Sequence, residues 1–292
     1  MDDDLSLASR LGWETLVGFE TFGQHSIAVA SSTPSDKALL LLHGFPSSSW
    51  DYHKLWPSLA KTHTLIAPDF LGFGLSDKPT GHRYSIMEQA DICEAVLNAR
   101  AIKHIDILAH DYGDTVAQEL LARAGEGSLG VSVGKTIMLN GGILPEAHRP
   151  LPIQSLLAGP LGPMLSKLLT KRRFKQSFSA IFGPKTQPVD AELNMVWDFL
   201  THNNGHRIAH TLLRYLAERR EQRERWVPPI LTPQGPLLLI NGSKDPISGK
   251  HMMDAYRRLG GKAEIIELAE IGHYPQLEAA EVILSVITHF LD

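Results

Sequence analysis

The sequence contains a single cysteine, no long apolar run and no strong excess of either charge. Because Cys93 stands alone, an intrachain disulfide framework and a cysteine-built zinc site are excluded, and a reducing compartment is favoured. No apolar stretch approaches the roughly 20 residues of a membrane span, and the acidic beginning, MDDDLSLASR, lacks the positive charge of a signal peptide. With 28 basic and 32 acidic residues, the net charge of −4 argues against a nucleic-acid partner. We therefore expect a cytoplasmic protein without a transmembrane segment, and its oligomeric state stays open.

Apolar residues are abundant, at 43% of 292 positions. This is enough for a large hydrophobic core in one or two domains. Six short apolar runs are typical of strands buried on both faces: Ala38–Leu42, Thr64–Ala67, Ile105–Ala109, Thr136–Leu139, Leu237–Ile240 and Ile265–Leu268. Amphipathic patterns predict helices at Ser85–Ala101, where Ser85 and Glu88 have capping-box spacing, and at Tyr112–Ala124 and Leu277–Phe290. Glu14–Phe19 and Ser26–Ala30 alternate in polarity like an antiparallel pair. Together these patterns predict an α/β fold, a mostly parallel sheet with helices on both faces.

The alternation of strands and helices stops between residues 145 and 229. That segment begins with prolines and glycines, contains no clear strand, and carries 13 Lys and Arg against 7 Asp and Glu. We therefore divide the chain into a core, residues 1–144 and 230–292, and an inserted helical lid, residues 145–229. The basic excess could attract anions or a membrane surface, but the i,i+4 pairs Glu218–Gln222 and Glu221–Arg225 favour ordinary solvated helix faces.

The strongest functional signal is the sequence from Ala109 to Gly113, AHDYG, directly after an expected strand and before an expected helix. It has the small-x-nucleophile-x-small pattern of a nucleophile elbow, with Asp111 where lipases have serine. The tight turn lifts the central side chain above the strand ends, at a helix N-terminus whose dipole stabilises an anion. We therefore expect Asp111 to be a nucleophile. Asp114 is interpreted as an acid that complements the helix dipole and points away, rather than one that raises the pKa of Asp111.

The sequence HGFP, beginning at His43, follows the first of the expected parallel strands. In an architecture of this kind, that loop and the residue after the nucleophile supply backbone donors to developing negative charge. The N–H groups of Phe45 and Tyr112 are therefore the expected oxyanion hole.

Two further loops bring a carboxylate and a histidine to the same edge of the expected sheet. Asp245 follows the strand at 237–240, and His273 lies in the loop after the strand at 265–268. The order nucleophile, acid, histidine is that of the α/β-hydrolase fold. The predicted catalytic triad is therefore Asp111, Asp245 and His273.

From end to end, the chain resembles the α/β-hydrolase superfamily. HGFP at 43–46, DFLGFGLSDKP at 69–79 and HDYG at 110–113 are similar to its epoxide hydrolase and haloalkane dehalogenase branch. HDYGDTVAQELL, NGGILPEAHRP and GHYPQLE resemble in particular the mesoderm-specific transcript proteins. The resemblance implies an α/β-hydrolase fold with an eight-stranded sheet and a helical lid. It also implies a small apolar epoxide or halogenated substrate, water as the second reactant, and no cofactor.

The resemblance further implies that Asp111 attacks saturated carbon and forms an alkyl ester. Water activated by His273 then hydrolyses this ester, while Asp245 holds the imidazole. Opening an epoxide also needs a proton donor, and Tyr215 lies where the resemblance places one lid tyrosine. We therefore favour an epoxide hydrolase. The alternatives are a haloalkane or haloacid dehalogenase with the same nucleophile and a hydrolase-fold binding protein without turnover.

Other residues are weaker candidates for the pocket. These are His43, Trp50 and Trp197, and the two tryptophans could line the pocket or donate to a halide, although packing is the favoured interpretation for both. Three histidines, at 202, 206 and 210, recur at helical spacing. Because Asn-Asn-Gly interrupts that helix and no acid accompanies them, no metal site is expected.

Overall fold

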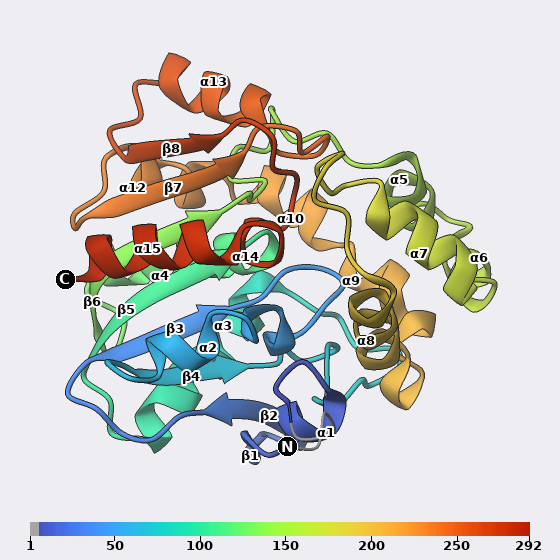
Figure 1. The fold of residues 1–292 in the computed structure, drawn as a ribbon, viewed down its shortest axis with the longest axis horizontal. Helices are drawn as coiled ribbons and strands as arrows, with labels where there is room; N and C mark the ends of the chain where they lie inside the picture. The colour runs from blue at the N-terminus through green and yellow to red at the C-terminus, as the bar shows by residue number, and fades with distance from the viewer. Residues whose placement is uncertain (1–5) are drawn as a thin grey trace.

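The computed structural model describes residues 6–292, and these form one eight-stranded sheet (Figure 1). Its strand order is β1-β2-β4-β3-β5-β6-β7-β8. The strands are β1 Val17–Phe22, β2 His25–Ser31, β3 Ala38–Leu42, β4 Thr64–Pro68, β5 His104–His110, β6 Ser132–Leu139, β7 Leu237–Gly242 and β8 Glu264–Leu268. β1 and β2 pair antiparallel, as do β2 and β4, and the remaining pairs are parallel. The carboxyl ends of the parallel strands therefore meet at one edge.

Helices cover both faces of this sheet (Figure 1). In the core these are α1 Arg10–Glu14, the 3-10 helix η2 Ser49–Tyr52, α2 Trp56–Leu59, α3 Ile86–Ala99, α4 Tyr112–Glu126, α13 Lys250–Arg258, α14 Pro275–Glu278 and α15 Ala280–Leu291. Leu40 and Leu42 of β3 belong to a core shared with α3, α4 and α13, whereas Leu39 and Leu41 belong to one shared with α1, α2 and α15. Because successive strand side chains point to opposite faces, a run of four leucines requires a helix layer on each side.

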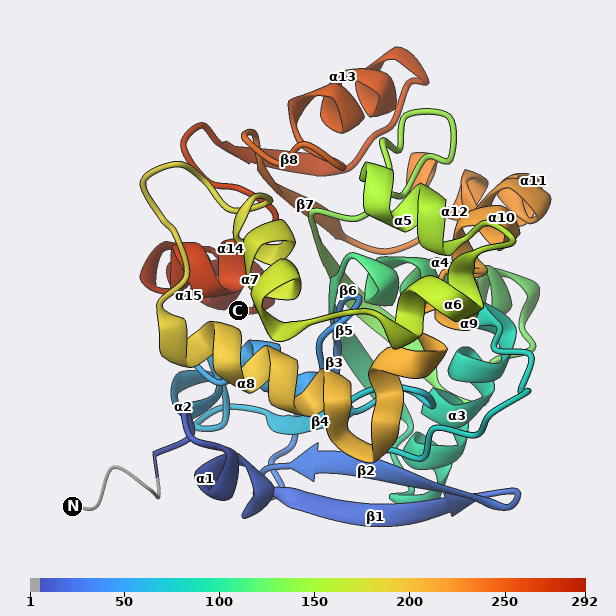
Figure 2. The same ribbon diagram turned by 90° about the vertical axis from the view of Figure 1, so that its right-hand side faces the viewer.

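The helices of residues 145–231 lie beside the core, and the last two of them pack against α4. They are α5 Pro152–Leu157, α6 Gly162–Lys167, α7 Lys171–Ser179, α8 Asp190–Thr201, η3 His202–Ile208, α9 Ala209–Leu212, α10 Tyr215–Glu221, α11 Arg223–Trp226 and α12 Pro228–Leu231. Figures 1 and 2 show α5 to α9 on the side toward which the parallel strands point. Helices α5 to α9 therefore lie next to the edge where the candidate residues gather.

The structure confirms the mostly parallel sheet and the six buried runs as strands. The strand expected at 14–19 is instead β1 at Val17–Phe22, because residues 10–14 form helix α1. Three other local expectations are wrong. β8 is partly exposed rather than buried on both faces, because it lies at the end of the strand order. The expected last helix is two helices, α14 and α15, separated at Ala279. Ser85 accepts a hydrogen bond from the Glu88 N–H at 3.1 Å, but the Glu88 carboxylate pairs with His82 instead of completing the capping box.

Candidate active site

Asp111 sits on a sharp turn between β5 and α4. Its φ is 48° and its ψ −101°, a conformation that L side chains rarely adopt and that marks a strained position. A Cβ at Gly113 would collide with the Leu42 carbonyl oxygen, so the small residue of the elbow is required by the close approach of β3. The local sequence thus lifts the Asp111 side chain above the strand ends.

The structure brings Asp111, His273 and Asp245 together at the carboxyl edge of the sheet. The Nδ1 atom of His273 lies 2.8 Å from Asp245 Oδ2, and its Nε2 lies 3.9 Å from Asp111 Oδ2. All three side chains are buried. The imidazole therefore faces the nucleophile candidate through one nitrogen and the acid candidate through the other.

Asp245 is held by several donors besides the histidine. The Ile247 N–H donates to Oδ1 at 2.7 Å, and Asn140 Nδ2 and Ser248 Oγ donate to Oδ2 at 2.9 and 2.7 Å. Burial would raise the pKa of Asp245, but His273 and these donors lower it below 3.8. Asn140, at the end of β6, therefore orients the carboxylate and keeps it charged.

The charges of Asp111 and His273 stabilise each other. Burial would lower the pKa of His273, but the Asp245 and Asp111 carboxylates raise it from 6.5 to about 10. Burial would raise the pKa of Asp111, but His273, and after it Arg219, hold it below its usual 3.8. Near neutral pH, the site consequently contains a carboxylate at Asp111 and an imidazolium at His273.

The Phe45 N–H, one of the two expected oxyanion donors, donates to Asp111 Oδ2 at 3.1 Å. The other, Tyr112, is the first residue of α4, so its N–H lies at the helix N-terminus. Donation to an oxyanion by Tyr112 stays a prediction. The Phe45 contact fixes one Asp111 oxygen and leaves Oδ1 on the side of Arg219, 3.8 Å from its Nη2.

Arg219, on α10, is a charged group of the site that the sequence did not identify. It is only 2% exposed, its Nε donates to Thr115 Oγ1 at 2.7 Å, and its guanidinium carbon lies 4.5 Å from the centre of the Tyr215 ring. A usable signal existed, because Tyr215 and Arg219 are four residues apart and share one helix face. An inward Tyr215 therefore implies an inward Arg219.

Asp114 was expected to point away from the site, but the structure buries it fully beside Asp111. A Cβ at Gly141 would collide with its carboxyl group, so β6 ends tightly against it. Burial and then the Asp111 charge raise the pKa of Asp114 well above 3.8. The pKa values of the two carboxyl groups thus move apart, that of Asp114 upward and that of Asp111 downward.

A narrow cavity of about 80 Å³ adjoins the site. It is lined by His273 and Phe45 and by apolar side chains of the inserted segment, among them Leu157, Phe174 and Phe178. This volume is small beside the roughly 300–1,000 Å³ of sites for drug-sized ligands. A larger substrate would therefore require the overlying helices to move.

The pocket candidates His43, Trp50 and Trp197 do not line this cavity. His43 accepts a hydrogen bond from the Phe70 N–H at 3.1 Å, and its other nitrogen lies 2.9 Å from the Gly44 carbonyl, so it ties two loops together. Trp50 donates to the Leu7 carbonyl at 3.1 Å. The Trp197 ring packs against that of Phe174 at a centroid distance of 5.5 Å, and Phe174 itself lines the cavity.

Tyr215 lies at the site but outside the cavity wall. Its ring contacts those of Tyr112 and Phe45, at centroid distances of 5.0 and 6.3 Å. Its hydroxyl is buried and has no hydrogen-bond partner among residues 6–292. Burial and the nearby Asp111 charge raise its pKa, so the hydroxyl stays protonated.

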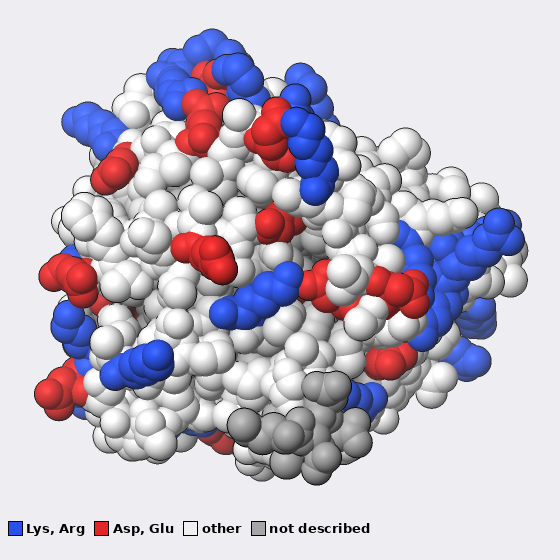
Figure 3. Space-filling model, viewed as in Figure 1, with Lys and Arg blue, Asp and Glu red and all other residues white. Residues whose placement is uncertain are grey.

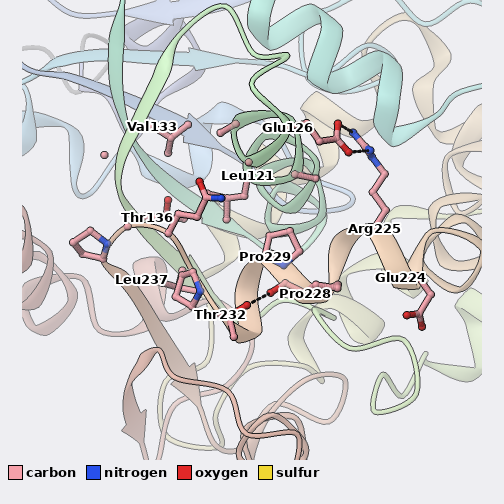
Figure 4. Close-up of a pocket in the computed structure, with 18 residues that line it drawn as sticks. Leu121, Glu126, Val133, Thr136, Glu224, Arg225, Pro228, Pro229, Thr232 and Leu237 are labelled. Atoms are coloured by element: carbon pink, nitrogen blue, oxygen red, sulfur yellow. Dashed lines mark hydrogen bonds and ion pairs between the residues drawn. The ribbon is translucent and has the colours of Figure 1, made fainter.

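A separate groove of about 660 Å³ lies where β6 and β7 begin, at the opposite edge of the sheet (Figure 4). It contains the ion pair of Arg225 with Glu126, and none of the predicted site residues lines it. The groove therefore does not change the location of the candidate site.

Among the described residues, no cluster of three or more His, Cys, Asp and Glu side chains is arranged to hold a metal ion. Within the same range, no helix is long and apolar enough to cross a membrane.

The parallel sheet, the strained aspartate turn and the histidine loop define a hydrolase of the α/β class. The chain belongs to the α/β-hydrolase fold family, whose model matches residues 37–280. It is 40% identical over 286 residues to the mesoderm-specific transcript homolog protein of Bos taurus, a match that spans 95% of this chain and 84% of that protein. It is also 28% identical over 269 residues to the cis-3-alkyl-4-alkyloxetan-2-one decarboxylase of Shewanella oneidensis, spanning 87% and 81%.

Solved structures share the whole architecture. The structure of the epoxide hydrolase CorEH has a TM-score of 0.75 and 17% sequence identity, and the match covers 94% of this chain and 97% of that one. Solved haloalkane dehalogenases also share the fold. At such identities the likeness concerns the fold, so the reaction must be argued from the residues of the site.

Proposed function

We propose that this hydrolase opens epoxides to vicinal diols through an alkyl ester on Asp111. The observation that carries the proposal is the position of His273, which faces Asp111 Oδ2 at 3.9 Å while its other ring nitrogen contacts Asp245 at 2.8 Å. A carboxylate is a weak nucleophile toward acyl carbon but can displace an oxygen leaving group from saturated carbon, and a strained ring favours this. The expected substrate is a small apolar epoxide, with water as the second reactant.

In the first step, Asp111 Oδ1 attacks a ring carbon of the epoxide. A C–O bond forms to the carboxylate, the ring C–O bond breaks, and the ring oxygen takes the proton of the Tyr215 hydroxyl. The Phe45 N–H keeps Oδ2 in place, so Oδ1 is the oxygen free to attack. The products are a hydroxyalkyl ester and a tyrosinate, which the neighbouring Arg219 guanidinium stabilises.

Ester formation removes the negative charge of Asp111, one of the charges that raise the pKa of His273. The pKa of His273 therefore falls, and its proton passes to the tyrosinate. Neutral His273 can then accept a proton from water, whose oxygen attacks the ester carbonyl. The tetrahedral intermediate then breaks its C–O bond to the alkyl group, and the departing alkoxide takes the remaining proton of the water. This releases the diol and leaves the Asp111 carboxylate beside the His273 imidazolium. Alkylation of the nucleophile thus converts the histidine into a base.

Dehalogenation by the same nucleophile is the second candidate, favoured by the aspartate at the elbow. It needs N–H donors for the leaving halide, and the Trp50 N–H is already bound to the Leu7 carbonyl. The Shewanella relative's name adds a third kind of electrophile, a four-membered oxetanone ring. These alternatives differ in the leaving group and not in the attacking residue.

Intact-protein mass spectrometry of His273→Gln tests the proposal. The variant is incubated separately with styrene oxide, 1-bromobutane and a cis-dialkyl oxetan-2-one. Because alkylation does not require the base, we expect a stable adduct equal to the mass of the whole epoxide, on the peptide that contains Asp111. The double variant Asp111→Asn/His273→Gln is the matched control and should remain unmodified.

The other outcomes are equally informative. A butyl adduct without an epoxide adduct would establish a dehalogenase instead, and an adduct from the oxetanone alone would redirect the assignment to lactones. Full multiple turnover by His273→Gln would contradict the triad. Absence of any adduct in properly folded protein, together with ligand-induced stabilisation, would favour a binding protein.

A further inference from the structure

The inserted segment carries an unusual combination of exposed apolar side chains and unbalanced positive charge. Between residues 147 and 189 there are seven Lys and Arg and no Asp or Glu. Of the ten large apolar side chains that are exposed in the described part of the chain, five lie within residues 153–168: Ile153, Leu156, Leu161, Met164 and Leu168. Their exposed fractions run from 37% to 57%. We call these five side chains the apolar patch.

Three cations lie within or just after the apolar patch in the sequence. Lys167, Arg172 and Arg173 are exposed, and none of them forms an ion pair with any of residues 6–292. By contrast, Lys171 and Lys175 of the same helix face Asp198 and Asp190 on α8. Figure 3 shows Lys and Arg side chains gathered on the side of the molecule where α6 and α7 lie, next to a surface of uncharged residues. Positive charges without an ion-pair partner therefore accompany apolar side chains that no described residue covers.

The same helices form the wall of the cavity beside His273. Leu157, Phe174 and Phe178 line it from α5 and α7 and are buried, whereas Ile153 of α5 both lines it and is 37% exposed. The cavity thus reaches the molecular surface within the apolar patch. A compound that leaves an apolar medium at this point would pass directly toward Phe45 and His273.

We propose that the α5–α7 surface docks on an anionic lipid bilayer and that apolar substrate enters the cavity from the bilayer. Apolar side chains flanked by Lys and Arg are the composition that inserts at the level of lipid headgroups, with the cations held by phosphates. The absence of acidic residues between 147 and 189 removes the repulsion that such a surface would otherwise meet. Docking in this manner requires no membrane-spanning helix.

A second copy of the chain fits this surface less well. In a two-fold dimer the same patch of both copies would form one interface. Lys167, Arg172 and Arg173 of each copy would then gather there, with no carboxylate among residues 147–189 to offset them. Unpaired like charges in a closing interface are repulsive. The charge pattern therefore favours a partner rich in phosphate over self-association.

Vesicle flotation with the full chain tests the proposal independently of turnover. Protein is mixed with phosphatidylcholine vesicles, with and without phosphatidylglycerol, at low and at physiological ionic strength. We expect binding to the anionic vesicles, weakened by salt because exposed charges are screened. The triple variant Lys167→Gln/Arg172→Gln/Arg173→Gln should bind much more weakly, by about fivefold per charge removed.

A matched control removes three cations from the opposite edge of the sheet. Lys37, Lys61 and Lys103 are exposed and precede β3, β4 and β5. Their triple Gln variant has the same net charge as the first and should bind like wild type. Equal loss in both triple variants would overturn the proposal, because binding would then follow net charge alone.

The contribution of the apolar patch has its own variant, Leu161→Ser/Met164→Ser/Leu168→Ser. We expect it to retain its melting temperature and to lose about tenfold or more in vesicle binding. Unchanged binding would overturn insertion. If wild type instead dimerises in sedimentation without lipid, and this variant does not, the patch is a protein interface and the proposal is wrong.

Insertion of the apolar patch into the bilayer can also be measured directly, by fluorescence. Because Cys93, the only cysteine, is buried, Leu161→Cys can be labelled with an environment-sensitive fluorophore at one place. We expect a blue shift on addition of anionic vesicles. Leu259→Cys, at an exposed position after α13, should show none. Equal shifts at both positions, or no shift at 161, would contradict docking through α5–α7. Failure here would leave the proposed reaction of Asp111 untouched, since no assay uses an epoxide.

Discussion

Arg219 donates a hydrogen bond from Nη2 to the backbone carbonyl oxygen of Asp111 at 3.0 Å. The contact joins helix α10 of the inserted segment to the strained turn that carries the proposed nucleophile. It supplies a partner to a buried carbonyl and places a cation 3.8 Å from the Asp111 carboxylate. The inserted segment therefore helps to form the site as well as to cover it.

The first prediction concerns this contact. Arg219→Met removes the cation that lowers the pKa of Asp111 and leaves the Asp111 carbonyl without its donor. We expect kcat/KM to fall about tenfold or more, and its acid limb to move to higher pH because a larger fraction of Asp111 is protonated. The loss of a buried charged donor should destabilise the fold by about 1–3 kcal/mol.

Arg219→Lys keeps the charge and should restore the acid limb, although it cannot form both hydrogen bonds. Arg225→Met is the matched control, because Arg225 lies on the next helix and pairs with Glu119 and Glu126. An unmoved acid limb in Arg219→Met would show that Arg219 serves packing only. Measurement of kcat/KM against pH decides the question.

Much of the fold follows from local composition. The four leucines in β3 and the apolar run at 237–240 need burial on both faces, so the parallel sheet could be predicted without any long-range information. Asp111 could be predicted because the turn restricts its neighbours to small residues. The place of Asp245 and His273 followed from strand order, because parallel strands end at one edge.

The position of Arg219 was harder to predict, because it lies 108 residues after Asp111 and meets it only through packing of the inserted segment. The orientation of Asp114 depended on Gly141 and on how closely β6 approaches α4. The roles of Trp50 and Trp197 were decided by a carbonyl at Leu7 and by the ring of Phe174. These are distant contacts that sequence spacing does not encode.

The second prediction concerns the stability and the kcat of Asp114→Asn. Because burial and Asp111 raise the pKa of Asp114, we expect the wild-type side chain to be a neutral acid, whose shape and neutrality asparagine reproduces. A raised carboxyl pKa favours the folded state only at low pH, so this contribution is lost as pH rises above 3.8. We therefore expect the variant to be at least as stable as wild type at neutral pH, with kcat changed less than about threefold.

Urea unfolding of both proteins at acidic and neutral pH checks this expectation. The stability gained by Asp114→Asn should increase with pH. A variant that is strongly destabilised at neutral pH would show that Asp114 is ionised in the folded protein and paired with Arg219.

The third prediction separates the two candidate reactions at Tyr215. In the His273→Gln background, Tyr215→Phe removes the proposed proton donor while keeping the ring that contacts Tyr112. We expect the single-turnover rate of adduct formation with styrene oxide to fall by about 10²- to 10⁴-fold. Alkylation by 1-bromobutane, which needs no proton, should change little.

Tyr84→Phe is the control for loss of a buried tyrosine hydroxyl, since Tyr84 donates to the Pro79 carbonyl instead of lying beside Asp111. It should leave both rates near those of the parent variant. Equal losses with epoxide and bromide in Tyr215→Phe would assign Tyr215 to packing.

The fourth prediction concerns the pH dependence of stability. The pKa of His273 is raised from 6.5 to about 10 in the folded protein by Asp245 and Asp111, against the effect of burial. Between these two values the folded state holds a proton that the unfolded state has lost. The stabilisation is therefore complete below pH 6.5 and disappears as pH rises toward about 10. We expect the unfolding free energy of wild type to fall across this interval more steeply than that of His273→Gln, as measured by urea unfolding at each pH.

His289→Gln, at an exposed position on α15, is the control and should show the same slope of unfolding free energy against pH as wild type. Parallel curves for wild type and His273→Gln would mean that His273 is already neutral beside Asp111. In that event, ester formation would not be the event that turns the histidine into a base.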